Sequence, residues 1–136
     1  MTAALALQKA MFQSLASSPE LTVLIGPDRV FDDVPQGVKP PFLVFGETSV
    51  APLGSSSEEG EEHTIALYAW SQENGRKQAT LVAGAVRKAL QELEEIEPPH
   101  VLAALHFVSG SIARDAPSQL YRARIEWRAV TETAEL

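Results

Sequence analysis

The residues best suited to acid–base chemistry or metal binding are three histidines, His63, His100 and His106. His100 and His106 share a face of one predicted strand, but at ~3.3 Å per residue they lie too far apart to bind one metal ion. His63 stands alone at the start of another predicted strand. A lone strand histidine is far more often a core or surface residue than a ligand. The histidines therefore predict no metal site.

The acids and hydroxyls also form no catalytic pattern. Asp32 and Asp33 precede a proline and are typical of a turn. Asp115 and Glu126 have no companion acid nearby in sequence. The stretch Gly54-Ser55-Ser56-Ser57 lacks the flanking pattern of a nucleophile elbow, and there is no phosphate-binding glycine motif. The chain has no cysteine. We therefore expect a protein that is not an enzyme and that uses neither metal nor cofactor.

Length and composition suit one small domain spanning residues 1–136. With 45% hydrophobic and 21% charged residues, the chain can bury a core and is unlike a disordered protein. No apolar segment approaches the ~20 residues that cross a bilayer. Residues 1–16 lack the charged start and apolar centre of a signal peptide. We expect a soluble protein, made in the cytoplasm, with no membrane partner.

Three helices are expected from the spacing of apolar residues and from the proline and glycine residues that mark helix boundaries. Residues 3–17 form the first, with Leu5, Met11 or Phe12, and Leu15 near helical spacing. A short second helix begins at Pro19. The longest helix opens after Asn74-Gly75 and ends at Pro98-Pro99. Its apolar side carries Ala79, Val82, Val86, Ala89 or Leu90, and Leu93.

Four strands are expected, at residues 42–50, 64–70, 100–111 and 119–131, after a brief extended piece at Val30-Phe31. Apolar residues on both faces of the second strand predict a central strand covered on both sides. The expected fold class is α+β. It is a single domain with a mostly antiparallel sheet of about four strands, packed against one long and one or two shorter helices.

The last strand alternates cleanly between an apolar and a charged face. Tyr121, Ala123, Ile125, Trp127 and Ala129 face one way. We expect this face to pack in the core with the long helix and with Trp70 or Ile65 of the first hairpin. Arg122, Arg124, Glu126 and Arg128 face the other way. That charged face is either solvated or in contact with a partner.

The net charge is −7, and the acids are clustered. One cluster is Glu58, Glu59, Glu61 and Glu62, within a loop (residues 52–62) that we expect to be a mobile hairpin tip. The other is Glu92, Glu94, Glu95 and Glu97. Such segregation is ordinarily solvated surface. Its functional alternative is that the Arg122, Arg124 and Arg128 row docks on the acids of a neighbouring copy. An acidic domain is not expected to bind DNA directly.

Several stretches, taken in order and spacing, resemble one family. They are Val30–Gly37, Pro41–Val44, Glu61–Ser71, Gly75–Ala79, Ala83–Leu90, Tyr121–Ala123 and Trp127–Thr131. The family is that of the small tail completion (tail terminator, head–tail joining) proteins of long-tailed phages and gene transfer agents, long catalogued as a domain of unknown function. The resemblance covers nearly the whole chain, although no single motif is diagnostic.

The resemblance implies a ring, commonly a hexamer, at the head–tail junction of a particle assembled in the bacterial cytoplasm. Such a ring caps the tail tube and joins it to the head connector or stopper protein, with DNA only in transit. The family has no catalytic residues to transfer. Two alternatives remain open: a small ligand-binding or regulatory domain that dimerises through its sheet, and a tail tube or other morphogenetic protein.

Overall fold

Local signals set the first two helices. The Thr2 hydroxyl accepts a hydrogen bond from the Leu5 N–H (3.1 Å) and starts α1 (Ala3–Ala16). The Ser18 hydroxyl accepts one from the Leu21 N–H (3.2 Å) and starts α2 (Pro19–Ile25), whose first residue is a proline. Both arrangements satisfy backbone donors that a helix start leaves free.

The computed structural model describes residues 1–54 and 60–133. Within them α2 leads to the short strand β1 (Val30–Phe31) and to a first hairpin, β2 (Phe42–Pro52) and β3 (Gly60–Trp70). α3 (Lys77–Gln91) then connects to a second hairpin, β4 (His100–Arg114) and β5 (Tyr121–Thr133). The expected α+β class and element order are confirmed. No helix in the described part of the chain is long and apolar enough to cross a membrane.

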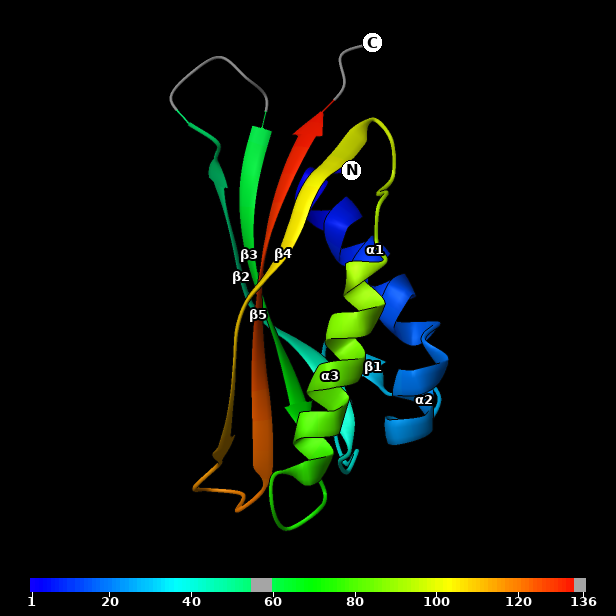
Figure 1. The fold of residues 1–136 in the computed structure, drawn as a ribbon, viewed down its shortest axis with the longest axis vertical. Coiled ribbons are helices and arrows are strands. Elements are labelled where there is room, and N and C mark those ends of the chain that lie inside the picture. Colours follow the sequence, from blue (N-terminus) through cyan, green and yellow to red (C-terminus); the bar gives the residue numbers. More distant parts are fainter. Residues whose placement is uncertain (55–59, 134–136) are drawn as a thin grey trace.

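The five strands form one open sheet in the order β1-β2-β3-β5-β4. β1 pairs with β2 in parallel, and all other pairs are antiparallel. The expected count of about four strands missed β1, because two residues are too short for a strand pattern. Figure 1 shows the three helices together on one face of the twisted sheet. β3 is central as expected, but among the described residues helices cover one of its faces, not both.

The core lies between this sheet face and the helices. β5 contributes Ile125 and Trp127, both almost fully buried, and α3 contributes Val82, Val86 and Leu90. Buried residues of α1 recur every fourth position, at Ala3, Leu7, Met11 and Leu15, with Ala6 buried beside this line. This corrects the expected stripe, because Leu5 and Phe12 lie off that line and are exposed.

Two sequence expectations about the ends of elements are corrected. α3 ends at Gln91 rather than near Pro98, and Glu92 caps it. Carboxylates oppose the negative end of a helix dipole, so a segment with three more glutamates gains little from staying helical. The strands of the first hairpin reach Pro52 and start at Gly60, inside the expected 52–62 loop. Residues 55–59 of that tip lie outside the described residues, so its mobility stays a prediction.

The β3–β5 register decides which aromatic side chains are buried. Trp127 pairs with Ile65, as expected, whereas Trp70 pairs with Arg122 and lies on the opposite face. Of the two expected partners on the first hairpin, Ile65 rather than Trp70 is therefore the one beside Trp127. The partner ring is that of Phe107 on β4, which meets Trp127 edge to face at 5.9 Å between centroids. The Trp127 indole N–H is buried without a hydrogen-bond partner among the described residues.

We predict that Trp127→Ala lowers the free energy of unfolding by about 3–5 kcal/mol, because it leaves a cavity in the core. Trp127→Phe should cost clearly less, since it keeps a ring against Phe107 and removes the unpaired N–H. Urea unfolding of the three proteins tests this order. An unchanged midpoint for Trp127→Ala would place this face of β5 outside the core.

Candidate assembly interface

The sheet face opposite the helices carries the arginine row predicted from the sequence. Arg122, Arg124 and Arg128 alternate with buried residues along β5. The register places Arg122 opposite Trp70, Arg124 opposite Tyr68 and Arg128 opposite Thr64 of β3. We call this surface the outer sheet face. Alternation along two antiparallel strands brings these side chains together.

Arg124 is the centre of a polar network on the outer sheet face. Its Nε donates to the Tyr68 hydroxyl (3.3 Å) and its Nη1 to Glu126 Oε1 (3.0 Å). Tyr68 in turn donates to the Glu47 carboxylate, 2.9 Å from Oε2. The Tyr68 hydrogen bond, with smaller help from Arg124, lowers the pKa of Glu47. Hydrogen bonds with Tyr68 and Glu126 raise the pKa of Arg124. The network therefore links β2, β3 and β5 through hydrogen bonds between Glu47, Tyr68 and Arg124.

The other two arginines also have partners within the subunit. The Arg122 guanidinium lies over the rings of Tyr68 and Trp70, 4.7 and 5.3 Å from their centroids. Arg128 Nε is 3.7 Å from Glu62 Oε1. Such cation–π contacts suit arginine, whose planar group stacks on aromatic rings.

These pairs are weak enough to exchange partners. Arg124 and Glu47 expose 35% and 62% of their side chains, and Arg128 and Glu62 expose 50% and 42%. Exposed ion pairs contribute roughly 0–1 kcal/mol each. A neighbouring molecule could therefore replace one carboxylate by another at little cost. The structure thus brings the three arginines together on one face, and each of them has a partner within the subunit.

The predicted acidic partners separate in the structure. Glu62 lies on the outer sheet face beside Arg128. Glu61 is the adjacent residue of the same strand, so its side chain points to the other face. Glu58 and Glu59 lie outside the described residues. Their part in an interface stays a prediction.

Sequence reasoning missed Gly46, Glu47 and Tyr68. A β-bulge between Phe45 and Thr48 interrupts the alternation of β2, which was expected to be a plain strand. A Cβ atom at Gly46 would collide with the Tyr68 ring. The glycine therefore lets Tyr68 lie flat across β2 and reach Glu47. A glycine inside a strand pattern is the sequence signal for such a close approach.

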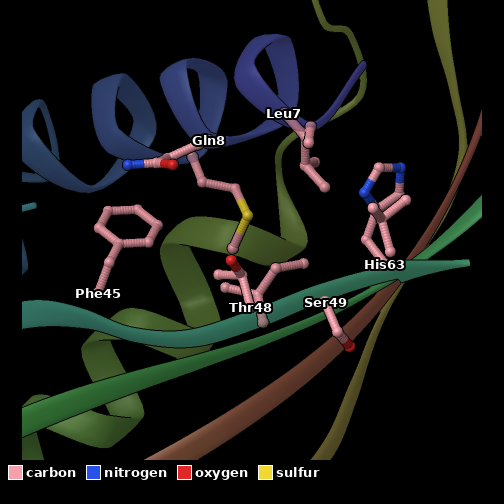
Figure 2. Close-up of a pocket in the computed structure, with 10 residues that line it drawn as sticks. Leu7, Gln8, Phe45, Thr48, Ser49 and His63 are labelled. Carbon is pink, nitrogen blue, oxygen red and sulfur yellow. The ribbon is translucent and has the colours of Figure 1, made fainter. Parts of the chain in front are cut away.

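His63 lies on the inner face, beside a small cavity under α1. The cavity, of about 110 Å³, is lined largely by apolar side chains of α1, β2 and β3. Figure 2 shows Leu7 and Gln8 of α1 above it, with His63 at one side. The His63 ring is 2.8 Å from the Thr131 hydroxyl, and burial lowers its pKa, with Glu61 partly opposing this. Ligand pockets commonly measure about 300–1,000 Å³. The cavity therefore does not favour the alternative of a ligand-binding domain.

The three histidines do not meet. His63 contacts Thr131, while His100 Nδ1 is 3.0 Å from Thr133 Oγ1. His106 pairs with Arg128 across β4 and β5. Within residues 1–54 and 60–133, no three His, Asp or Glu side chains are placed to hold a metal ion.

The described residues thus combine helices on one side of an open sheet with a charged and aromatic outer face. The family model of tail completion protein gp17 matches residues 9–132, and the chain belongs to this family. It is therefore a structural subunit of a phage-type tail, located in the virion at the head–tail junction. This confirms the resemblance found in the sequence.

Two solved structures share the fold. One is a chain from the virion of a native gene transfer agent particle, with 24% identity and a TM-score of 0.82, over 95% of this chain and 96% of that one. The other is the gp17 protein of bacteriophage SPP1, with 23% identity and a TM-score of 0.67, over 98% and 91%. Comparison with curated protein sequences gives no match.

We predict that Gly46→Ala displaces the Tyr68 ring and disconnects Glu47 from Arg124. The pKa of Glu47 should then rise toward its ordinary value, because its largest lowering influence is the Tyr68 hydrogen bond. Carboxylate NMR titration measures this, with Gly84→Ala as a control at a position where an added Cβ meets nothing. An unshifted Glu47 titration in Gly46→Ala would show that the glycine does not position Tyr68.

We also predict that stability declines below pH 6.5 through His63. The folded-state pKa lies below the ordinary 6.5, so the unfolded chain takes up a proton first as the pH falls. Stability is therefore full above pH 6.5 and is lost as the pH falls through the lower folded-state pKa. Urea unfolding between pH 7.5 and 5.5 should show a smaller decline for His63→Gln than for wild type. Equal declines would exclude His63 as the cause.

Proposed function

We propose that the protein closes into a ring of identical subunits, expected to be a hexamer, that terminates the tail tube. The ring would bind the tail tube protein on one side and the head connector or stopper protein on the other. The family membership supports this proposal. The single structural observation that carries it is the outer sheet face, an ordered polar surface free of helices in the part of the chain that the structure describes.

A closed ring needs two different, complementary surfaces on each subunit. On the proposed arrangement, Arg122, Arg124 and Arg128 contact acids of the next copy, with Glu58, Glu59, Glu61 and Glu62 at the hairpin tip as their complements. The weak internal pairs of these arginines support this, because such pairs exchange readily. The tip would then order against its neighbour.

The proposed role is mechanical rather than catalytic and requires no cofactor. DNA would pass through the ring opening without specific binding. A net charge of −7 suits this role, because an acidic subunit repels phosphate and does not retain DNA in transit. The proposal thus combines a stable ring with a passage to which DNA does not adhere.

Electron microscopy of the purified protein, and of particles made without it, tests the proposal. We expect closed rings in the first sample. In the second we expect heads separated from tails and tails of irregular length. Normal particles made without the protein would overturn the proposed function.

We predict that Arg122→Glu combined with Arg124→Glu leaves a folded monomer that forms no rings. The substitutions reverse the charge of the outer sheet face without touching the core. Raised salt should weaken assembly of the wild type as well, because exposed charges are screened. Lys39→Glu combined with Lys77→Glu changes the net charge equally, at exposed positions away from this face, and should still form rings. Rings formed by the arginine variant at low salt would show that this face is solvated and does not contact a neighbouring subunit.

A further inference from the structure

A second surface, between α3 and the β4–β5 hairpin, has the form of a docking site, and Arg124 of the outer sheet face also lines it. A groove of about 580 Å³ runs between α3 and strands β4 and β5. One wall is a stripe at helical spacing on α3, formed by Arg76, Thr80, Gly84 and Arg87. The opposite wall includes Phe107 and Ile112 of β4. We call it the α3–β4 groove.

Gly84 keeps the α3–β4 groove open. It lies exposed in the middle of α3, where glycine destabilises a helix relative to alanine. A Cβ atom at Gly84 would meet nothing within 4 Å. Packing within the subunit therefore gives no reason for glycine here. The space above it is available to a side chain or backbone of another molecule.

Two arginines give the groove its charge preference. Arg76 lies over the Tyr121 ring and Arg87 over the Phe107 ring, 5.3 and 3.8 Å from the centroids. Among the described residues neither forms an ion pair, in contrast to Arg124 and Arg128. Stacking holds a guanidinium flat and leaves its N–H edge free for a carboxylate. The groove therefore suits an acidic segment with apolar neighbours.

We propose that the α3–β4 groove binds the acidic segment of residues 92–97 from a second copy of this chain. The segment displays exposed Glu92, Glu94 and Glu95, while Ile96 is buried and holds it in place. It follows the C-terminal end of α3 and none of its residues lines the groove, which extends along α3 from Arg76 to Arg87. Groove and segment are thus different surfaces of one subunit, as a head-to-tail contact in a ring requires. This inference rests on the proposed ring.

Complementary charge reversal tests the contact. Arg76→Glu with Arg87→Glu alters the groove, and Glu94→Lys with Glu95→Lys alters the segment. Each variant alone should lose at least about tenfold in ring formation, because like charges then meet. An equal mixture should recover rings, since each altered surface meets its altered complement in an alternating ring. Circular dichroism confirms that both variants fold.

A bulk substitution tests the groove without changing charge. Gly84→Met fills the space and should block ring formation while keeping the fold. Leu81→Met places the same side chain at an exposed α3 position outside the groove, also without a change of charge, and should assemble as wild type. Full assembly of Gly84→Met would overturn the proposal, as would rings formed by the segment variant alone.

The ring and the groove contact can fail separately. Wild-type rings that tolerate these substitutions overturn the groove contact and leave the proposed function standing. If the wild type forms no rings, a peptide covering residues 90–99 still tests the contact by NMR. It should shift the Gly84 and Gly110 amides of the wild type but not those of the groove variant. No shift in the wild type would overturn the inference.

Discussion

The structure depends on the two-residue alternation of β5. Its inner residues, centred on Trp127, fill the core between the sheet and the helices, and its outer residues are charged. A shift of one residue in register would bury the arginines and expose the tryptophan, so pairing with β3 and β4 is strongly specified. Because the helices lie on the inner face, the outer face of the sheet carries no helix in the part of the chain that the structure describes (Figure 1).

No helix packs on the outer sheet face in the described part of the chain. Hydrogen bonds between polar side chains hold the side chains of this face in place. Tyr68 lies over Gly46, reaches Glu47 and accepts from Arg124, which ties three strands together. Each contact is weak alone, yet shared partners restrict one another's rotamers. The outer face therefore has a defined shape before any partner arrives, which lowers the entropy cost of binding.

The elements whose apolar residues follow a regular period could be predicted from the sequence. The alternation of β5 and the apolar stripe of α3 are long enough to identify their element and its buried face. Features that depend on a few tertiary contacts could not be predicted. The two residues of β1 carry no period, and the place of Trp70 follows from its register opposite Arg122. The Tyr68 network depends on a bulge and a glycine whose partner is distant in sequence, and the groove depends on two stacked arginines.

The outer sheet face and the α3–β4 groove differ in whether their arginines already form ion pairs within the subunit. On the outer sheet face the arginines already hold carboxylates or rings of their own chain, so a neighbour must displace something. In the α3–β4 groove, Arg76 and Arg87 lie over aromatic rings and form no ion pair among the described residues. The charges of the outer sheet face are thus already partly balanced within the subunit. In the proposed ring, a neighbour that binds in the groove would therefore displace no internal ion pair of Arg76 or Arg87, whereas one on the outer sheet face would exchange partners with existing pairs.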